Sequence, residues 1–409
     1  MQRLIIRGGK PLAGTVRISG SKNAVLPMLA ASLLFRRGCC IRGCPELTDV
    51  EAAVEILRFL GAEVRKTGDT LRIDPRNARE RLIPERLMNR MRGSVFFAGA
   101  MMARFGRCVL RQPGGCPLGA RPVDFHAAGL RAFGAAEAVP GQFEGLTGGA
   151  FRLPYPSVGA TENLLMAALG AEMPCRIENA AREPEIVSLC DFLRSGGCRI
   201  TGDGTEKVEI FPGLPDRTET ELIPDRMEAA TFLCAAASAG GRVRLDHVNP
   251  RHLEAVTAVL KDAGCRIETG ESRMEISASA LHAPGNLVTG PYPAFPTDAQ
   301  APMLAAMLRA QGSFTMKETV FSDRMKHIPG LLALGGRIEC RDNLARVTGV
   351  GQLRGASVRA GDLRGAAALA VAALGAEGET RIDGLAHLLR GYERFDEKLR
   401  ALGADAGLT

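Results

Sequence analysis

One short pattern occurs six times along the 409-residue chain and constrains its fold more than any other feature. The pattern is Leu-x-x-x-Gly followed by a small residue, and its glycines are Gly61, Gly134, Gly197, Gly264, Gly335 and Gly403. Neighbouring glycines lie roughly 68 residues apart, so six copies of one repeat account for nearly the whole chain. Glycine is typical of the position where a helix ends in the left-handed conformation. The pattern therefore predicts six repeats, each with a helix that ends at its glycine.

Each repeat also contains a second helix that is rich in alanine and apolar on nearly every face. These helices are expected to begin near Ser21, Met88, Ser157, Pro224, Pro296 and Ala360. A helix with apolar side chains all round must be buried, whereas the glycine-terminated helices carry more charge and should lie outside. Short β-rich runs such as KVEIFPG separate the helices. Together with a length that suits two domains of about 200 residues, this predicts two similar α/β domains of three repeats each, with helices packed inside sheets.

Composition excludes several classes of function. The net charge is +7, but no run of five or six basic residues exists, and the chain has no Trp and three Tyr; this argues against a nucleic-acid partner. No apolar run approaches the ~18 residues of a membrane span, and the N-terminus lacks the apolar core of a secretory signal. The 11 cysteines contain no C-x-x-C pair, which indicates a reducing compartment. We expect a cytoplasmic protein without a membrane partner.

Polar residues gather at the starts of the buried helices. They are Lys22, Asn23, Arg92, Ser157, Thr161, Asp225, Arg226, Thr297, Asp298, Asp362 and Arg364. A helix start offers free N–H groups and a partial positive charge, which bind phosphate or carboxylate. If the three buried helices of a domain are parallel, their starts converge on one surface. A structural solenoid without a site is the alternative, but the uneven distribution of polar residues favours an anion site.

The outer helices add a second set of cations at a common repeat position. Arg121, Arg182, Arg251, Arg324 and Arg390 each lie 11–15 residues before the glycine of their repeat, and Thr48 takes this place in the first repeat. One such arginine alone is typical of a solvated helix start. Five at nearly the same position favour a shared cleft for anions.

The segment Arg111–Asp124, RQPGGCPLGARPVD, is the most specific part of the sequence. Two prolines and two glycines surround Cys116 within five residues, so the segment is neither a helix nor a central strand. It is expected to form an exposed loop, a plausible lid. Most cysteines pack as small apolar groups, but exposure and the nearby Arg121 favour a reactive thiol at Cys116.

This loop resembles that of the UDP-N-acetylglucosamine 1-carboxyvinyltransferases, a family of enolpyruvyl transferases. The segments SGSKNAVLPMLAASLL, SVGATEN, ENAAREPEIV, AFPTDAQA, ETVFSDRMKHIP and RGYERFDEKLRALGA also match, in order, from the first residue to the last helix. The resemblance implies two inside-out α/β barrel (prism) domains, each of three repeated βαβαββ-like units with buried helices. It implies transfer of the enolpyruvyl group of phosphoenolpyruvate to the 3′-hydroxyl of UDP-N-acetylglucosamine, the first committed step of peptidoglycan synthesis. The related enzyme that acts on shikimate 3-phosphate shares the architecture but lacks the cysteine loop.

The resemblance also implies roles for individual residues. Cys116 would act as the acid and form a covalent adduct with phosphoenolpyruvate, Asp298 would accept the hydroxyl proton, and Asp362 would support the acid–base network. Phosphoenolpyruvate would be bound by Lys22, Asn23, Arg121, Arg324, Arg364 and Arg390, of which Lys22 and Arg390 also count as catalytic. The UDP-sugar would be contacted by Arg92, Arg121, Pro122, Val123, Asp124, Phe125, Ser157, Val158, Asp298 and Val320. His126 lies beside these positions, but alone it is typical of a helix surface.

The resemblance implies that residues 22–223 form one domain, which carries Lys22, the Cys116 loop and part of the UDP-sugar site. Residues 1–21 and 224–409 form the second domain, which carries Asp298, Arg324, Asp362, Arg364 and Arg390. Neither a cofactor nor a metal is expected, because the cations suffice for phosphate and no His/Cys/Asp cluster has metal-ligand spacing. We expect a monomer that binds small molecules only.

Several positions depart from the family pattern. Thr48 stands where a basic residue is common and Leu389 where Asp is common, and Ala299 and Pro302 replace the usual Met and Gln. Pro302 cannot donate to the carbonyl of Asp298, so a distorted helix start is expected there. Two alternatives stay open: another acceptor, such as shikimate 3-phosphate, or a non-catalytic regulatory paralogue that binds the UDP-sugar.

Overall fold

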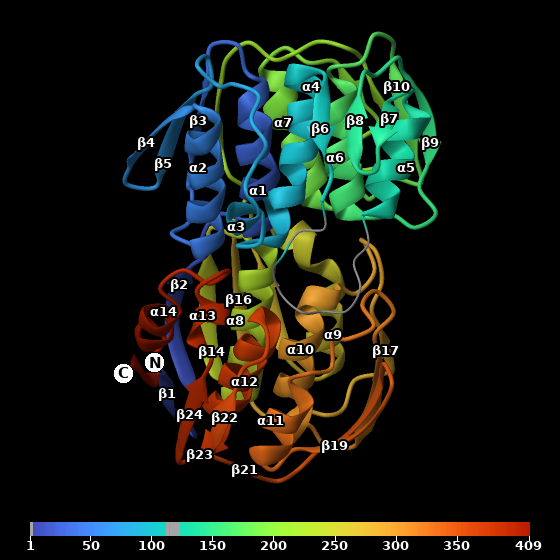
Figure 1. Cartoon of the computed structure of the whole chain (residues 1–409). Helices are drawn as coiled ribbons and strands as arrows, with labels where there is room; N and C mark the ends of the chain where they lie inside the picture. The colour runs from blue at the N-terminus through green and yellow to red at the C-terminus, as the bar shows by residue number, and fades with distance from the viewer. Residues whose placement is uncertain (1–2, 112–113, 115–122) are drawn as a thin grey trace. The chain divides into compact units, whose positions relative to one another are not determined.

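The computed structural model describes residues 3–111, 114 and 123–409, which divide into two compact units. The inserted unit comprises residues 20–111, 114 and 123–223, and the terminal unit comprises residues 3–19 and 224–409. In both units, apolar helices lie inside a jacket of small sheets (Figure 1). In the described part of the chain, no helix is long and apolar enough to cross a membrane.

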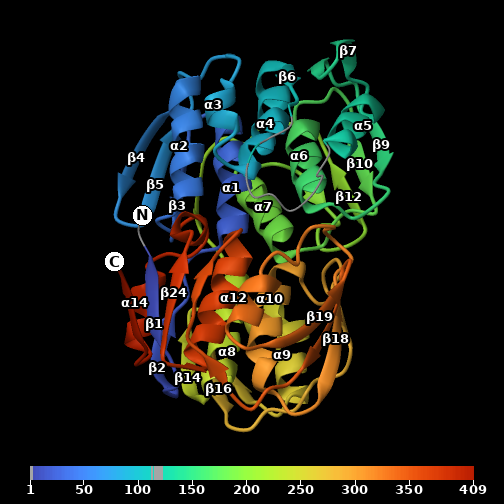
Figure 2. The ribbon, with the colours of Figure 1, turned by 60° about the horizontal axis from the view of Figure 1, so that its bottom comes forward.

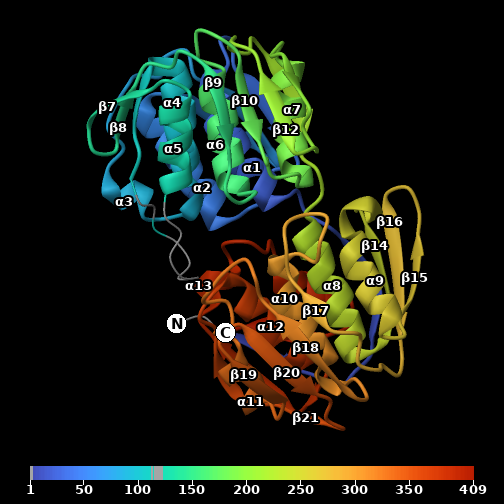
Figure 3. The same cartoon turned by 90° about the vertical axis from the view of Figure 1, so that its right-hand side faces the viewer.

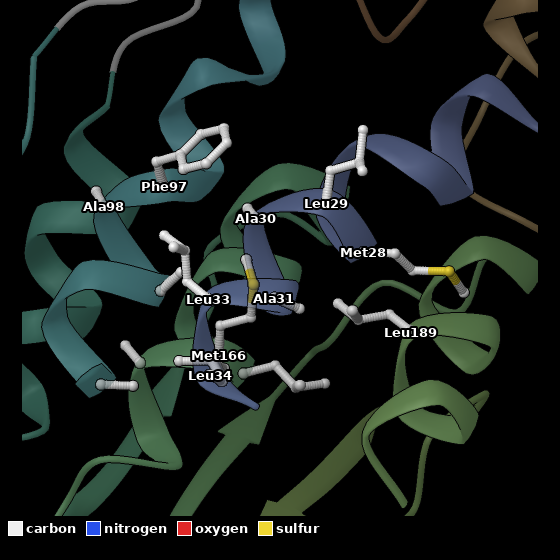
Figure 4. Packing of buried hydrophobic residues seen from close by; sticks show 14 of the residues in the cluster. Met28, Leu29, Ala30, Ala31, Leu33, Leu34, Phe97, Ala98, Met166 and Leu189 are labelled. Carbon is white, nitrogen blue, oxygen red and sulfur yellow. The ribbon is translucent and has the colours of Figure 1, made fainter. Parts of the chain in front are cut away.

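Three apolar helices form the core of the inserted unit as described. They are α1 (Lys22–Ala31), α4 (Phe96–Phe105) and α6 (Val158–Ala168), and they pack on one another. Met28, Phe97 and Met166 belong to one cluster of buried apolar residues, and each is at most 1% exposed (Figure 4). Around this core lie α2 (Thr48–Leu60), α5 (Asp124–Ala132) and α7 (Pro184–Ser195), with short helices at α3 (Glu85–Met88), η1 (Ser32–Leu34) and η2 (Arg92–Val95).

The sheets of the inserted unit follow its repeats. One has the order β13 (Thr218–Glu221), β3 (Cys39–Arg42), β5 (Thr70–Asp74), β4 (Glu63–Thr67). Another has the order β11 (Ile200–Thr201), β12 (Lys207–Ile210), β10 (Cys175–Glu178), β9 (Gly149–Arg152), and the last three of these strands lie side by side in Figure 3. A smaller sheet has the order β6 (Arg107–Val109), β8 (Gln142–Glu144), β7 (Ala136–Val139).

The terminal unit repeats this plan. Its buried helices α8 (Arg226–Ala239), α10 (Thr297–Ala306) and α12 (Leu363–Leu374) pack side by side (Figure 2). The helices outside them are α9 (Glu254–Asp262), α11 (Ile328–Ala333), α13 (Leu385–Leu388) and α14 (Phe395–Ala401), with single turns at η3 (Pro250–Leu253) and η4 (Met307–Arg309).

The two ends of the chain meet in one sheet of the terminal unit, whose order is β22 (Ser357–Arg359), β24 (Glu379–Asp383), β1 (Leu4–Arg7), β25 (Asp405–Leu408). A second sheet is β15 (Arg266–Thr269), β16 (Arg273–Ala278), β14 (Gly241–Asp246), β2 (Leu12–Arg17). A third is β17 (Leu287–Val288), β18 (Ser313–Lys317), β20 (Leu344–Thr348), β19 (Arg337–Arg341), and β21 (Leu353–Arg354) pairs with β23 (Ala376–Glu377). Strand alternation turns one side of each sheet towards the helices, as in Phe314 and Met316 of β18.

The repeat-based fold prediction is confirmed. All six repeat glycines have φ between 82° and 100°, the left-handed conformation in which a Cβ would be strained. The buried helices form as predicted, with one difference in the second. A continuous helix from Met88 is wrong, because the chain breaks after α3 and restarts as the 3₁₀ turn η2. The Ser94 hydroxyl lies 2.8 Å from the carbonyl oxygen of Met88 and 2.9 Å from that of Met91, so it competes with helical bonding there.

Proline at the sixth position does not end the buried helices that contain it. Pro302 lies inside α10, and Pro27 occupies the same relative place in α1. Both helices run for 10 residues and continue as 3₁₀ turns. The helix that begins at Thr297 therefore forms even though the Asp298 carbonyl lacks a donor at Pro302.

Candidate active site

Asp298 is the centre of a charged cluster in the terminal unit. Its Oδ1 lies 2.5 Å from Nη2 of Arg324, and its Oδ2 lies 2.8 Å from Nη2 of Arg364. The two arginine side chains are 2% and 4% exposed, whereas that of Asp298 is 26% exposed. The carboxylate is thus the accessible member of the cluster, and a guanidinium engages each of its oxygens.

The N-terminal cap of α12 fixes the position from which Arg364 extends. Asp362 is 2% exposed, and its Oδ1 accepts the backbone N–H groups of Arg364 and Gly365, both at 2.9 Å. Such a carboxylate satisfies the helix start and opposes the helix dipole. In the structure Asp362 caps α12, and its place in the acid–base network, which the resemblance implies, stays a prediction.

Burial and the neighbouring groups shift the pKa of Arg364 in opposite directions. Burial alone lowers the pKa of its guanidinium, but Asp298 and the hydroxyl of Tyr392 raise it, and the result is a pKa far above the ordinary value. Arg364 is therefore a permanent cation. It stabilises the ionised form of the neighbouring carboxylate.

His327 lies beside this cluster at the start of α11 and is 3% exposed. Burial lowers its pKa to about 4; Asp362 raises the value and Arg324 lowers it further. The imidazole is consequently neutral at pH 7. Neither ring nitrogen has a hydrogen-bond partner among the described residues.

Glu318 connects α10 with the loop that carries Val320. Its Oε1 accepts the N–H groups of Val320 and Phe321 at 2.7 and 3.1 Å, and its Oε2 accepts the Thr297 hydroxyl at 2.8 Å. Glu318 is 2% exposed. A single buried carboxylate therefore fixes both the helix start beside Asp298 and the half-buried Val320.

Arg390 lies between α13 and α14 and is half-buried. Burial lowers the pKa of His387, Arg390 lowers it further, and Asp362 raises it, so these charges lie close enough to act on one imidazole. The terminal unit thus brings together Asp298, Arg324 and Arg364, with Asp362 at the helix start that carries Arg364. Arg251 is exposed on η3. The cleft shared by the repeat arginines stays a prediction.

In the inserted unit, Lys22 begins α1 and is 8% exposed. Its Nζ lies 2.8 Å from Oδ2 of Asp49, whose side chain is 4% exposed. Ser21 caps the helix by accepting the Ala24 N–H at 3.3 Å, and Asn23 is half-buried in the first turn. The ion pair holds the lysine at the helix start.

The helix-surface interpretation of His126 is wrong, because this residue of α5 is 5% exposed. The Asn163 amide lies 3.0 Å from Nδ1 of His126, and Oδ1 of Asn163 accepts the N–H of Gly99 at 2.7 Å. Burial lowers the pKa of His126 to about 4, Arg92 lowers it further, and Asp124 raises it. The ring is neutral, so Nδ1 accepts from the amide and Nε2 carries the proton. Burial also lowers the pKa of the half-buried Arg92.

Ser157 and Val158 open α6 and are half-buried. The Ser157 hydroxyl caps the helix by accepting the Ala160 N–H at 3.3 Å. Further along, Glu162 is 1% exposed; burial first, then Glu185 and Glu183, raise its pKa well above the usual value. Burial therefore favours the protonated form of this acid.

Some predicted site residues lie outside the described residues: Cys116, Arg121 and Pro122. Beside them, Val123 and Phe125 are half-buried and Asp124 is exposed at the start of α5. Four residues in or beside the cluster were not among the predicted site residues: Glu318, His327, Tyr392 and Thr231. Only the first three could have been found from the sequence, because they lie within the segments ETVFSDRMKHIP and RGYERFDEKLRALGA that resemble the family.

The described residues contain no group of three His, Cys, Asp or Glu side chains arranged to hold a metal ion. Every described cysteine is free, and Cys340 is the exposed one among them. The described part of the site offers a partly exposed carboxylate that can accept a proton, and buried cations suited to phosphate or carboxylate groups.

Sequence relatives match this chain over nearly its whole length. The family model of EPSP synthase (3-phosphoshikimate 1-carboxyvinyltransferase) matches residues 6–399. A UDP-N-acetylglucosamine 1-carboxyvinyltransferase of Gloeobacter violaceus is 43% identical over 410 residues, 98% of this chain and 89% of the relative. That of Xylella fastidiosa (strain 9a5c) is 43% identical over 420 residues, 99% of both chains. UDP-N-acetylglucosamine 1-carboxyvinyltransferase 2 of Caldanaerobacter subterraneus subsp. tengcongensis is 40% identical over 413 residues, 99% of both.

Solved structures show the same fold. The enolpyruvyl transferase NikO from Streptomyces tendae superposes with a TM-score of 0.89 and 26% identity, over 100% of this chain and 99% of that one. EPSP synthase from Acinetobacter baumannii gives a TM-score of 0.76 with 20% identity and complete coverage of both chains. The second likeness concerns the fold alone.

Proposed function

The chain belongs to the EPSP synthase family, and from this membership we propose that it transfers the enolpyruvyl group of phosphoenolpyruvate to the 3′-hydroxyl of UDP-N-acetylglucosamine and releases phosphate. It is an enzyme of the transferase class, and its product enters peptidoglycan synthesis. Among the structural observations, the Asp298 cluster carries the proposal. A partly exposed carboxylate held by two buried guanidinium groups supplies a proton acceptor and two anion-binding groups in one place.

The proposed reaction is an addition followed by an elimination. The sugar 3′-oxygen bonds to C2 of phosphoenolpyruvate, the hydroxyl proton leaves to a base, and the methylene carbon takes a proton to become a methyl group. The resulting tetrahedral ketal then loses a methyl proton as its C–O bond to phosphate breaks. Asp298 is the proposed base and Cys116 the proposed acid. Arg324, Arg364 and Arg390 would balance the phosphate and carboxylate charges.

The cluster explains how substrate would activate the base. Each oxygen of Asp298 accepts a hydrogen bond from a guanidinium group, so one lone pair on each oxygen is used and two cations oppose the uptake of a proton. An incoming carboxylate or phosphate offers an arginine a new bidentate partner. When one arginine turns to the substrate, one oxygen of Asp298 becomes available. The base therefore acts only when the anion is present.

We assign the UDP-sugar to the inserted unit through the start of α6. Ser157 and Val158 form that start, and a helix N-terminus capped by a neutral serine is suited to a diphosphate. Arg92 and the segment from Val123 to Phe125 supply further contacts, and Lys22 is assigned to phosphoenolpyruvate. Cytoplasmic action is part of the proposal and is consistent with free thiols at the described cysteines.

The deciding experiment measures phosphate release from phosphoenolpyruvate with UDP-N-acetylglucosamine and, in parallel, with shikimate 3-phosphate. We expect release with the UDP-sugar alone, and its loss in Cys116→Ala. Cys340→Ala is the matched control, because Cys340 is exposed on β19, and its activity should equal that of the wild type. Release with shikimate 3-phosphate would overturn the acceptor assignment. No release with either acceptor, from folded protein, would instead indicate a non-catalytic paralogue.

A further inference from the structure

Arg364 differs from Arg324 in what anchors the far side of its guanidinium group. Its Nη2 donates to Asp298, while its Nη1 donates to the hydroxyl of Tyr392 at 3.0 Å. Tyr392 is 1% exposed and lies between α13 and α14. Arg364 therefore bridges the carboxylate at the start of α10 and a buried phenol from a distant part of the chain.

The hydrogen bonds behind Arg364 have a fixed direction. The Thr231 hydroxyl on α8 donates to the carbonyl oxygen of Met227 at 2.9 Å, so its only proton is used. Its oxygen lies 2.8 Å from the Tyr392 hydroxyl, which must then be the donor. The tyrosine oxygen accordingly accepts from Arg364, which has no acceptor of its own. Burial raises the pKa of Tyr392, which keeps its proton in place.

Arg324 has no comparable support. Its Nη2 contacts Asp298 and, at 3.4 Å, the carbonyl oxygen of Thr297, which are both at the start of the same helix. The Nε atoms of both arginines lack partners among the described residues, and both guanidinium groups lie near an aromatic ring. The difference is the hydroxyl: within the described residues no side-chain hydroxyl bonds to the guanidinium group of Arg324. Arg324 can turn away from Asp298 without breaking a hydrogen-bond chain, whereas Arg364 cannot.

We propose that Tyr392 and Thr231 are positioning residues that hold Arg364 on Asp298, so that Arg324 is the arginine that passes to phosphoenolpyruvate. This inference rests on the proposed function, because it assigns a task to each arginine of that site. Arg364 keeps Oδ2 of Asp298 engaged throughout the reaction. Oδ1, released by Arg324, faces the hydroxyl proton.

The test separates turnover from substrate binding. Tyr392→Phe removes the phenol oxygen but keeps the ring, which packs 5.1 Å from Phe395 between centroids. Thr231→Val removes the next hydroxyl, and Thr231→Ser keeps it. We expect kcat to fall about tenfold in Tyr392→Phe and severalfold in Thr231→Val, with the KM for phosphoenolpyruvate within about twofold and recovery in Thr231→Ser. Arg324→Lys should instead raise that KM by more than about tenfold.

Thr257→Val is the matched control. Thr257 also bonds within its helix, to the carbonyl oxygen of Glu254 at 3.1 Å, and it is 9% exposed, but it touches no arginine of the site. Its kcat should equal that of the wild type. Tyr392→Phe combined with Thr231→Val should be no slower than Tyr392→Phe alone, because the two hydroxyls act through one chain.

Two results would overturn the inference. One is an unchanged kcat in folded Tyr392→Phe; the other is a raised KM for phosphoenolpyruvate with an unchanged kcat, which would make Arg364 the substrate arginine. A crystal structure of Tyr392→Phe gives a readout that does not need turnover. If Arg364 still contacts Asp298 in that structure, the positioning role is wrong, even if the wild type is active. If instead the wild type releases no phosphate, the proposed function is wrong.

Discussion

The two units use different side chains to cap their buried helices, apart from α10 and α4, which have no side-chain cap. In the terminal unit, Asp225 accepts the N–H groups of Met227 and Glu228 at 2.8 and 2.9 Å, and Asp362 does the same at the start of α12. In the inserted unit, Ser21 and Ser157 each accept one N–H at 3.3 Å. The same fold thus has carboxylates at helix starts in one unit and neutral hydroxyls in the other.

This difference in capping predicts which helix starts attract an anionic ligand. A carboxylate cap already opposes the positive end of the helix, so a second anion gains little there. The terminal unit must bind anions through arginine side chains, as its Asp298 cluster suggests. A serine cap adds no charge, so the starts of α1 and α6 keep their attraction for phosphate groups. The idea that all buried helix starts bind anions alike is therefore too simple.

The largest expected effect comes from removing the charge at the centre of the terminal unit. Asp298→Asn should lower kcat about 10³-fold, because an amide does not accept the hydroxyl proton and general-base catalysis contributes about 10²–10⁴-fold. Phosphate release with saturating substrates measures kcat, and circular dichroism verifies folding. An active Asp298→Asn would mean that the base lies elsewhere and that the terminal unit only binds anions.

The next effect concerns acid stability, because each unit buries a neutral histidine. Burial lowers the pKa of His126 and of His327 to about 4, from an ordinary value of about 6.5. Between these values the unfolded chain binds a proton that the folded chain does not, so stability is lost as pH falls from about 6.5 to about 4.

Urea unfolding at pH 7, 5.5 and 4.5 measures this loss. His126→Gln should remove a pH-dependent loss on the order of 2–3 kcal/mol, whereas the exposed His282→Gln should leave the wild-type profile. A profile for His126→Gln as steep as that of the wild type would show that His126 titrates normally in the folded protein.

Exchanging the caps tests the comparison directly. Ser157→Asp should raise the KM for UDP-N-acetylglucosamine about tenfold, since a carboxylate at the start of α6 repels the diphosphate, while Ser157→Ala should change it less. Asp362→Ser should lower the free energy of unfolding by about 0.5–2 kcal/mol through the weaker cap. Steady-state kinetics and thermal unfolding give the two values. Tighter UDP-sugar binding by Ser157→Asp would contradict the assignment of that helix start.

The smallest effect is expected at Arg251, which shares the repeat position of Arg324 but is exposed. Arg251→Ala should change kcat and KM less than about twofold and the free energy of unfolding by less than about 0.5 kcal/mol, as at an ordinary surface position. Arg324→Ala is its counterpart and should raise the KM for phosphoenolpyruvate strongly. A large loss in Arg251→Ala would support the prediction of one cleft shared by all the repeat arginines.

Local signals in the sequence were enough for the repeating elements. The six glycines and the six alanine-rich helices could be predicted because left-handed helix ends and all-round apolarity depend on neighbouring residues alone. The resemblance supplied the candidates Asp298, Arg324 and Arg364 on the same basis, residue by residue. It did not say how they would pair.

The sequence by itself determined the repeat, the buried helices and the residue types at their starts. Tertiary structure alone decided that Asp298 engages both Arg324 and Arg364, that Tyr392 and Thr231 stand behind Arg364, and that Arg251 faces solvent. These partners are far apart in the chain: Thr231 and Tyr392 are separated by 161 positions. The physical reason is that such contacts depend on how α8, α10 and α12 pack against one another, and helical periodicity within one segment carries no information about which side chain of another segment will meet it.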